Sequence, residues 1–166
     1  MKYEPLKFKF LPEDKIFCTF QIKRSEDEYD QYNFTTVDKP APGLLNQSLL
    51  FRKYVLNLCE LPESEEEIHK LEIKSFSFSW SGEKHIMGCT ISASRKLSGS
   101  NSPLILNTPH KIEDFHADNG DTKQLLPRNM VNDIYELMLH INSFIDGERE
   151  QLDLFSELIA MRKKAG

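Results

Sequence analysis

The chain has 166 residues, a length typical of one domain with a short appendage. Its 21 basic and 26 acidic side chains give a formal net charge of −5, and the sequence pI is about 5.6. This balance argues against a general nucleic-acid binder whose affinity comes from neutralising phosphates, although it leaves room for a local basic face. The hydrophobic content of 39% includes 11 Phe, enough for a folded core if the rings converge. Disorder throughout the chain is therefore excluded.

No apolar run approaches the ~20 residues of a membrane-spanning helix, and the first residues lack the apolar core of a signal peptide. The three cysteines, Cys18, Cys59 and Cys89, are odd in number and lie in unrelated surroundings. This indicates reduced thiols rather than a disulfide framework or a zinc site. We therefore expect a cytoplasmic protein with no membrane partner.

The N-terminal residues alternate in the manner of two antiparallel strands joined by a tight turn. Leu6, Phe8 and Phe10 alternate with lysines, and residues 16–23 again place apolar side chains on one face after a Pro-Glu-Asp turn. The stretch 25–43 is mostly acidic or polar and ends in a Pro-Ala-Pro-Gly sequence. It predicts a long, solvated connection.

Residues 44–60 have helical spacing between Pro42 and Pro62. The expected apolar stripe consists of Leu45, Leu49, Leu56 and Cys59. Ser64 and Glu67 then have the spacing of a capping box, in which each side chain bonds the other residue's amide. The run of acids around Glu67 is therefore expected to be a solvated helix start rather than a metal site.

The clearest hairpin lies at 75–94. Phe76, Phe78 and Trp80 alternate with serines, and after the turn at 81–84 apolar and small polar residues alternate again. Ile73 is out of phase with Phe76, which predicts a bulge near Lys74 and Ser75.

The strongest helical pattern covers 127–145 and stops at Asp146-Gly147. Its apolar face is built from Met130, Ile134, Leu137, Met138, Ile141, Phe144 and Ile145. We therefore predict an α+β domain at 1–147, in which an antiparallel sheet is covered by this long C-terminal helix. Residues 148–166 form a C-terminal appendage that carries a short motif.

No residue pattern supports catalysis. His110, Asp114, His116, Asp118 and Asp121 gather in one segment, but their intervals match no zinc or two-His helical pattern, and the segment has the composition of an exposed loop. The glycines are scattered, no serine sits in a nucleophile elbow, and Cys18 and Cys89 occupy inward strand positions. We expect no enzyme activity, no cofactor and no metal.

The 75–94 hairpin also offers a nucleic-acid hypothesis. Its three aromatic rings share one strand face, as a platform for stacking single-stranded bases requires. Basic side chains lie nearby in the sequence, namely Lys74, Lys84, His85, Arg95 and Lys96. Against this, a chain with so little apolar content needs these rings in its core, and the serine face is the one expected in water. We therefore expect only weak intrinsic affinity for nucleic acid.

The most informative residues are Gln151, Leu152, Asp153, Leu154 and Phe155. All five match the short linear motif by which bacterial replication and repair proteins dock on the sliding clamp of the DNA polymerase. A match this strict is expected by chance in on the order of one chain in a thousand of this size. The resemblance implies an extended peptide whose Leu154 and Phe155 fill a preformed apolar pocket, while the Gln151 amide bonds polar groups at its rim.

The same residues have a second interpretation. Leu152, Phe155, Leu158, Ile159 and Arg162 fall at helical spacing, which is typical of a terminal amphipathic helix packed on its own domain. Leu154 lies off that stripe, whereas the position beyond a helix stop suits a docking peptide. Both interpretations stay open on the sequence.

A weaker resemblance extends over about residues 70–155. The segment 101–111, preceded by a serine-rich hairpin and followed by a long helix and a Gln-Leu-x-Leu-Phe ending, is similar to small uncharacterised proteins of bacteriophages and prophages. The resemblance assigns no activity, but it makes a bacterial clamp the expected partner. The sequence therefore predicts a replication-associated protein that is either recruited to DNA or competes with host users of the clamp. The alternatives are single-stranded nucleic-acid binding through an aromatic strand face, and a phage accessory protein whose C-terminal segment is only a packed helix.

Overall fold

The fold is that of a computed structural model, which describes residues 1–113, 122–150 and 161–165. The strands are β1 (Glu4–Leu11), β2 (Lys15–Lys23), β3 (Tyr29–Thr36), β4 (Leu71–Ser81), β5 (Ile86–Arg95), β6 (Leu104–Asn107) and β7 (Lys111–Ile112). The helices are α1 (Pro42–Leu49), α2 (Phe51–Leu58), α3 (Glu65–His69) and α4 (Arg128–Ile145), with a 3₁₀ turn at Thr122–Gln124.

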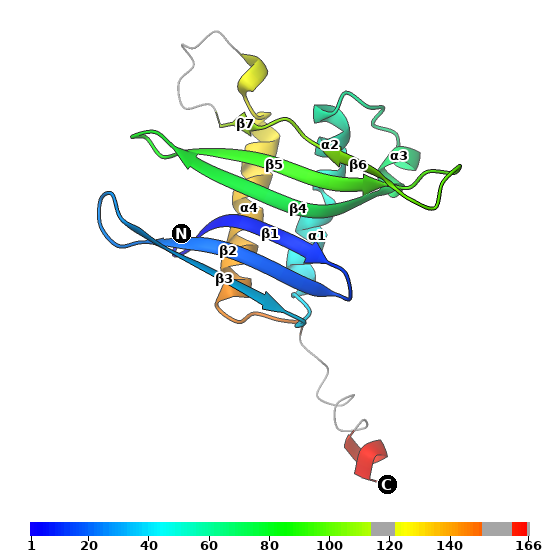
Figure 1. Ribbon diagram of the computed structural model, residues 1–166, viewed down its shortest axis with the longest axis horizontal. Coiled ribbons are helices and arrows are strands. Elements are labelled where there is room, and N and C mark those ends of the chain that lie inside the picture. Colours follow the sequence, from blue (N-terminus) through cyan, green and yellow to red (C-terminus); the bar gives the residue numbers. More distant parts are fainter. Residues whose placement is uncertain (114–121, 151–160, 166) are drawn as a thin grey trace.

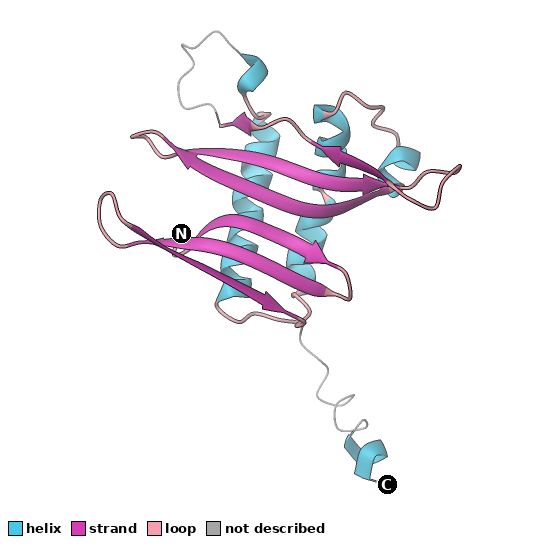
Figure 2. Ribbon diagram, in the orientation of Figure 1, coloured by secondary structure: helices cyan, strands magenta, loops and turns pink. Residues whose placement is uncertain are grey.

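One antiparallel sheet forms the centre of the molecule, with strands in the order β3-β2-β1-β4-β5-β6 and with β7 paired to β5. Helices α1, α2 and α4 lie behind this sheet in Figure 1, and none of the described helices covers the face toward the viewer (Figure 2). The predicted α+β class, an antiparallel sheet covered by a long C-terminal helix, is therefore confirmed. Among the helices that the structure describes, none is long and apolar enough to span a membrane.

The two N-terminal strands are confirmed, but the solvated connection predicted for 25–43 is wrong in its middle part. Strand β3 pairs with β2 along its whole length and forms one edge of the sheet. Phe34 of this strand packs toward the core, where its ring stacks on that of Phe144 at 6.0 Å, and the half-exposed Tyr32 ring stacks on the buried Phe20 ring at 5.6 Å. An edge strand with one face in water keeps mostly polar side chains, so its composition resembles that of a loop.

The helix predicted over 44–60 is divided into α1 and α2 by Leu50. The predicted stripe is wrong at Leu45 and Leu49, which are 40% and 48% exposed, and correct at Leu56, which is fully buried. The buried side chains of the two helices are Leu44, Ser48, Phe51, Tyr54, Val55 and Leu56. The inward face is therefore rotated relative to the prediction, and α1 presents two leucines to solvent.

Strands β4 and β5 form the predicted hairpin, and their register shifts between Ile73 and Ser75, as the phase change predicts. Phe76 and Phe78 are buried and Trp80 is partly buried. The ring of Phe76 meets Phe51 of α2 edge-on at 5.1 Å. The aromatic face is thus covered as expected, but α2 shares this role with α4.

Helix α4 buries the predicted face, except that Ile145 is only partly buried. Its Phe144 ring meets Phe8 of β1 edge-on at 5.8 Å, which places α4 along the central strand. The helix ends at Ile145 with Asp146 as its C-cap, and Gly147 has φ +107°, a left-handed conformation that glycine adopts without strain.

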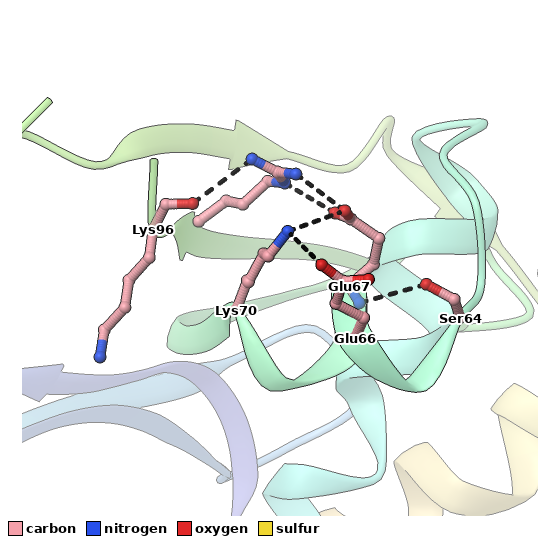
Figure 3. Close-up of polar contacts among 6 residues, drawn as sticks. Ser64, Glu66, Glu67, Lys70 and Lys96 are labelled. Carbon is pink, nitrogen blue, oxygen red and sulfur yellow. Dashed lines mark hydrogen bonds and ion pairs between the residues drawn. The ribbon is translucent and has the colours of Figure 1, made fainter. Parts of the chain in front are cut away.

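A polar cluster fastens α3 to the end of β5 (Figure 3). The Ser64 hydroxyl accepts a hydrogen bond from the Glu67 amide at 3.2 Å, as the capping pattern predicts. The Glu67 side chain does not return to Ser64. Instead it accepts two hydrogen bonds from the Arg95 guanidinium, at 2.8 and 2.9 Å, and pairs with Lys70 at 3.4 Å.

This cluster is expected to make the stability of the fold depend on acid pH. Hydrogen bonding from Arg95 holds the pKa of Glu67 below its ordinary value of 4.5. Its stabilising contribution is therefore complete above that value and is lost as the pH falls through the lower pKa of the folded state. Near neutral pH, Glu67→Gln is expected to unfold at a lower urea midpoint than the wild type. At about pH 3 the two midpoints are expected to lie closer together. An equal gap at both pH values would contradict this role.

Candidate functional site

The five motif residues Gln151, Leu152, Asp153, Leu154 and Phe155 lie outside the described residues. The structure does show how the chain is held immediately before them. Residues 148–150 follow the end of α4 and contact both α4 and the segment that joins β3 to α1. We call residues 148–150 the anchor.

Arg149 is the centre of the anchor. Its guanidinium lies over the Phe144 ring, 3.8 Å from the ring centroid, which is close enough for a cation–π interaction. The same group donates hydrogen bonds to the carbonyl oxygens of Phe144 and Glu148, and it pairs with Asp38 at 3.3 Å. Arg149 thus caps the Phe144 carbonyl near the end of α4 and links it to the chain after β3.

The backbone on both sides of Arg149 is also bonded. The Glu148 amide donates to the Ser143 carbonyl at 2.9 Å, and the Glu150 amide donates to the Lys39 carbonyl at 2.9 Å. Together with the contacts of Arg149, these bonds hold the backbone of the anchor against the folded domain. The residue that precedes Gln151 is therefore bonded to the folded domain.

A groove of about 870 Å³ begins beside the anchor, and Glu150 is part of its wall. It opens where β1 and β4 separate, because these strands pair only from Lys7 to Lys9. Its apolar lining comes from β1, β2, α1 and β4 and includes Phe10, Ile16, Leu45, Leu49, Leu71 and Ile73. The two exposed leucines of α1 therefore lie in a concave apolar surface.

Only part of the polar segment that begins at His110 lies within the described residues. His110 lies 2.9 Å from the Ser79 hydroxyl, while Asp114, His116, Asp118 and Asp121 lie outside the described residues. No three metal-ligating side chains come together within 1–113, 122–150 and 161–165. Cys18 and Cys89 are free and buried at inward positions, and burial raises the pKa of both thiols to about 12. Both thiols therefore stay protonated at neutral pH.

The aromatic stacking platform predicted as an alternative does not form on the hairpin. Phe76 and Phe78 face the helices, and the Trp80 ring stacks on His85 at 5.0 Å. Two of the basic side chains expected nearby form ion pairs, Lys74 with Glu72 at 3.1 Å and Arg95 with Glu67. Phe76 and Phe78 are therefore unavailable to nucleic-acid bases.

Comparisons of the chain with protein-family models, curated proteins and solved structures found no match. The functional argument consequently depends on the residues themselves. Sequence reasoning missed the anchor, because Arg149 lies in a charged run with no pattern that marks it as bonded to the domain. The apolar groove was missed for a related reason, since the exposed leucines of α1 were expected in the core.

Proposed function

We propose that the protein docks on the sliding clamp of a bacterial DNA polymerase through Gln151, Leu152, Asp153, Leu154 and Phe155. The observation that carries this proposal is the match of all five residues to the clamp-binding motif. In this proposal the protein is not an enzyme. It acts by its position on the clamp, where it is either recruited to replicating DNA or displaces other users of the same pocket.

The chemistry of the five residues suits such a pocket. Leu154 and Phe155 supply two adjacent apolar anchors, and small interfaces draw most of their affinity from a few anchors of this kind. Leu152 adds apolar contact, while the amide of Gln151 orients the peptide by bonding at the rim. An extended peptide of this length gives moderate affinity without unfolding any part of the domain.

The anchor supports this proposal by its location. Because Glu150 is bonded to the Lys39 carbonyl, a partner bound at Gln151 is held close to the domain surface near α1 and the end of β3. A short tether raises the effective concentration of the domain at the surface of the partner. Docking would therefore place the folded domain against the clamp itself, which suits an adaptor or a competitor.

The test is a titration of the full chain against a purified bacterial sliding clamp, in which calorimetry or fluorescence anisotropy reports binding. We expect saturable binding that a peptide spanning 148–158 displaces and that a scrambled peptide of equal composition does not. A clamp loaded with DNA polymerase then separates the two roles, because a competitor releases the polymerase. Failure of the full chain to bind the clamp, or failure of the 148–158 peptide to displace it, would exclude the proposal.

A further inference from the structure

The face of the sheet opposite α1, α2 and α4 has two lysines at its centre. Direct pairing across β1 places Lys7 beside Thr19 of β2 and Ser77 of β4. Residues paired in this way point to the same side of a sheet, and Phe8, their neighbour in β1, is fully buried on the opposite side. Lys9 repeats the arrangement one step along the strand, between Phe17 and Ser75. We define the open face as Lys7, Lys9, Phe17, Thr19, Ser75 and Ser77.

Among the described residues, the two ammonium groups of the open face have no acidic partner. Within the described residues, neither lysine forms an ion pair with a carboxylate, and the interactions of Lys7 are with Lys9. Burial and the neighbouring charge of Lys9 lower the pKa of Lys7. An anion placed between these two groups would relieve the repulsion of their like charges.

Two acidic side chains near the ends of the open face have partners of their own. Glu4 accepts a hydrogen bond from Gln21 at 2.7 Å and lies 2.7 Å from the imidazole of His85. Glu72 pairs with Lys74 at 3.1 Å. Lys7 and Lys9 therefore place two adjacent positive charges on the open face of a chain whose net charge is −5. Its surrounding serine and threonine hydroxyls supply donors that suit phosphate oxygens.

Phe17 gives the open face an aromatic ring outside the core. It is only partly buried, takes part in none of the ring contacts between described residues, and does not belong to the core cluster. Its direct partner across the strands is Lys9. A ring next to a cation is the combination on which single-stranded nucleic acids stack a base and place a phosphate.

We infer that the open face binds single-stranded nucleic acid, with Lys7 and Lys9 on consecutive phosphates and a base stacked on Phe17. Side chains two residues apart on one strand are spaced by about 7 Å, which is comparable to the separation of phosphates in an extended strand. A single strand is the form that fits, because its bases are free to stack on an exposed ring, whereas the bases of a duplex are stacked on one another. The binding is weak by itself, because two cations neutralise only two phosphates. This inference is independent of clamp docking.

The test measures anisotropy of a labelled oligothymidylate with the full chain, without any clamp, at several salt concentrations. We expect Lys7→Gln with Lys9→Gln to reduce affinity at ~50 mM salt by at least about tenfold and to make the slope of log K against log salt shallower by about 1.4. Phe17→Ala is expected to reduce affinity by about 5-fold or more, without changing that slope.

The matched control is Lys53→Gln with Arg128→Gln, which removes the same charge from exposed positions on the helical side. It is expected to keep the wild-type affinity and slope. An equal loss in the control would show that net charge, and not the open face, governs binding. The inference is overturned by that result, by the absence of oligothymidylate binding to the wild type, or by tighter binding of a labelled polyglutamate at the same lysines.

Discussion

Leu154→Ala combined with Phe155→Ala is expected to abolish binding to the sliding clamp and to leave the melting temperature of the protein unchanged. Each of these side chains is a proposed anchor, and truncating an anchor costs about 2 kcal/mol or more of binding free energy. The two losses together correspond to a reduction in affinity of about 1000-fold. The measurements are a clamp titration and a thermal melt of the same sample.

A second variant separates the motif from an ordinary packed helix. Leu158 and Ile159 lie on the apolar stripe of the helical interpretation but outside the five motif residues. Leu158→Ala with Ile159→Ala is therefore expected to retain clamp binding. If the segment stabilises the domain by packing on it, both double variants should instead lower the melting temperature, because each removes buried apolar surface.

The groove beside Glu150 is the reason why both clamp binding and the melting temperature have to be measured. Its apolar lining, with Leu45 and Leu49, is an available surface for any amphipathic segment of the protein or of a partner. A lowered melting temperature together with unchanged clamp binding in the Leu154 and Phe155 variant would overturn the docking proposal. An unchanged melting temperature together with lost binding would support it.

The periodic elements of the fold were predictable because each buries one face. Alternation in β1, β2, β4 and β5 and the spacing of α4 specify which side chains lie inside, and even the bulge at Lys74 appears as a change of phase. Strand β3 was not predictable, since its backbone pairing with β2 leaves little mark on its side chains. The inward face of α1 was misjudged because Ser48 is buried there while Leu49 is exposed.

The candidate site likewise has a part that is predictable from the sequence and a part that is not. A linear motif is a local pattern, so Gln151 and Phe155 are visible in the sequence alone. The anchor and the open face are not local, because they depend on residues that only the fold brings together. Arg149 meets Asp38 across 111 positions, and Lys9 meets Ser75 across β1 and β4. Patterns of spacing within one segment carry no information about such pairs.

Phe144→Ala is expected to cause the largest loss of stability among the changes considered for the described residues. The ring is 1% exposed and contacts Phe8 of β1 and Phe34 of β3, so it joins α4 to two strands. Removing a buried Phe costs about 3–5 kcal/mol through lost transfer free energy and the cavity left behind. That is a large part of the ~5–15 kcal/mol by which native proteins are stable. Urea unfolding monitored by circular dichroism gives the value.

Arg149→Gln is the matched control for this variant, because it removes the cation above the same ring and leaves the ring in place. The guanidinium is partly exposed, so its interactions with Phe144 and Asp38 are expected to contribute only about 1 kcal/mol or less. Phe144→Ala should therefore be several times more destabilising than Arg149→Gln. Similar losses in the two variants would mean that the anchor, rather than the packing of α4 on β1 and β3, holds the end of this helix on the sheet. If packing dominates, Phe144→Leu, which retains most of the apolar volume, should cause a loss of stability between those of Phe144→Ala and Arg149→Gln.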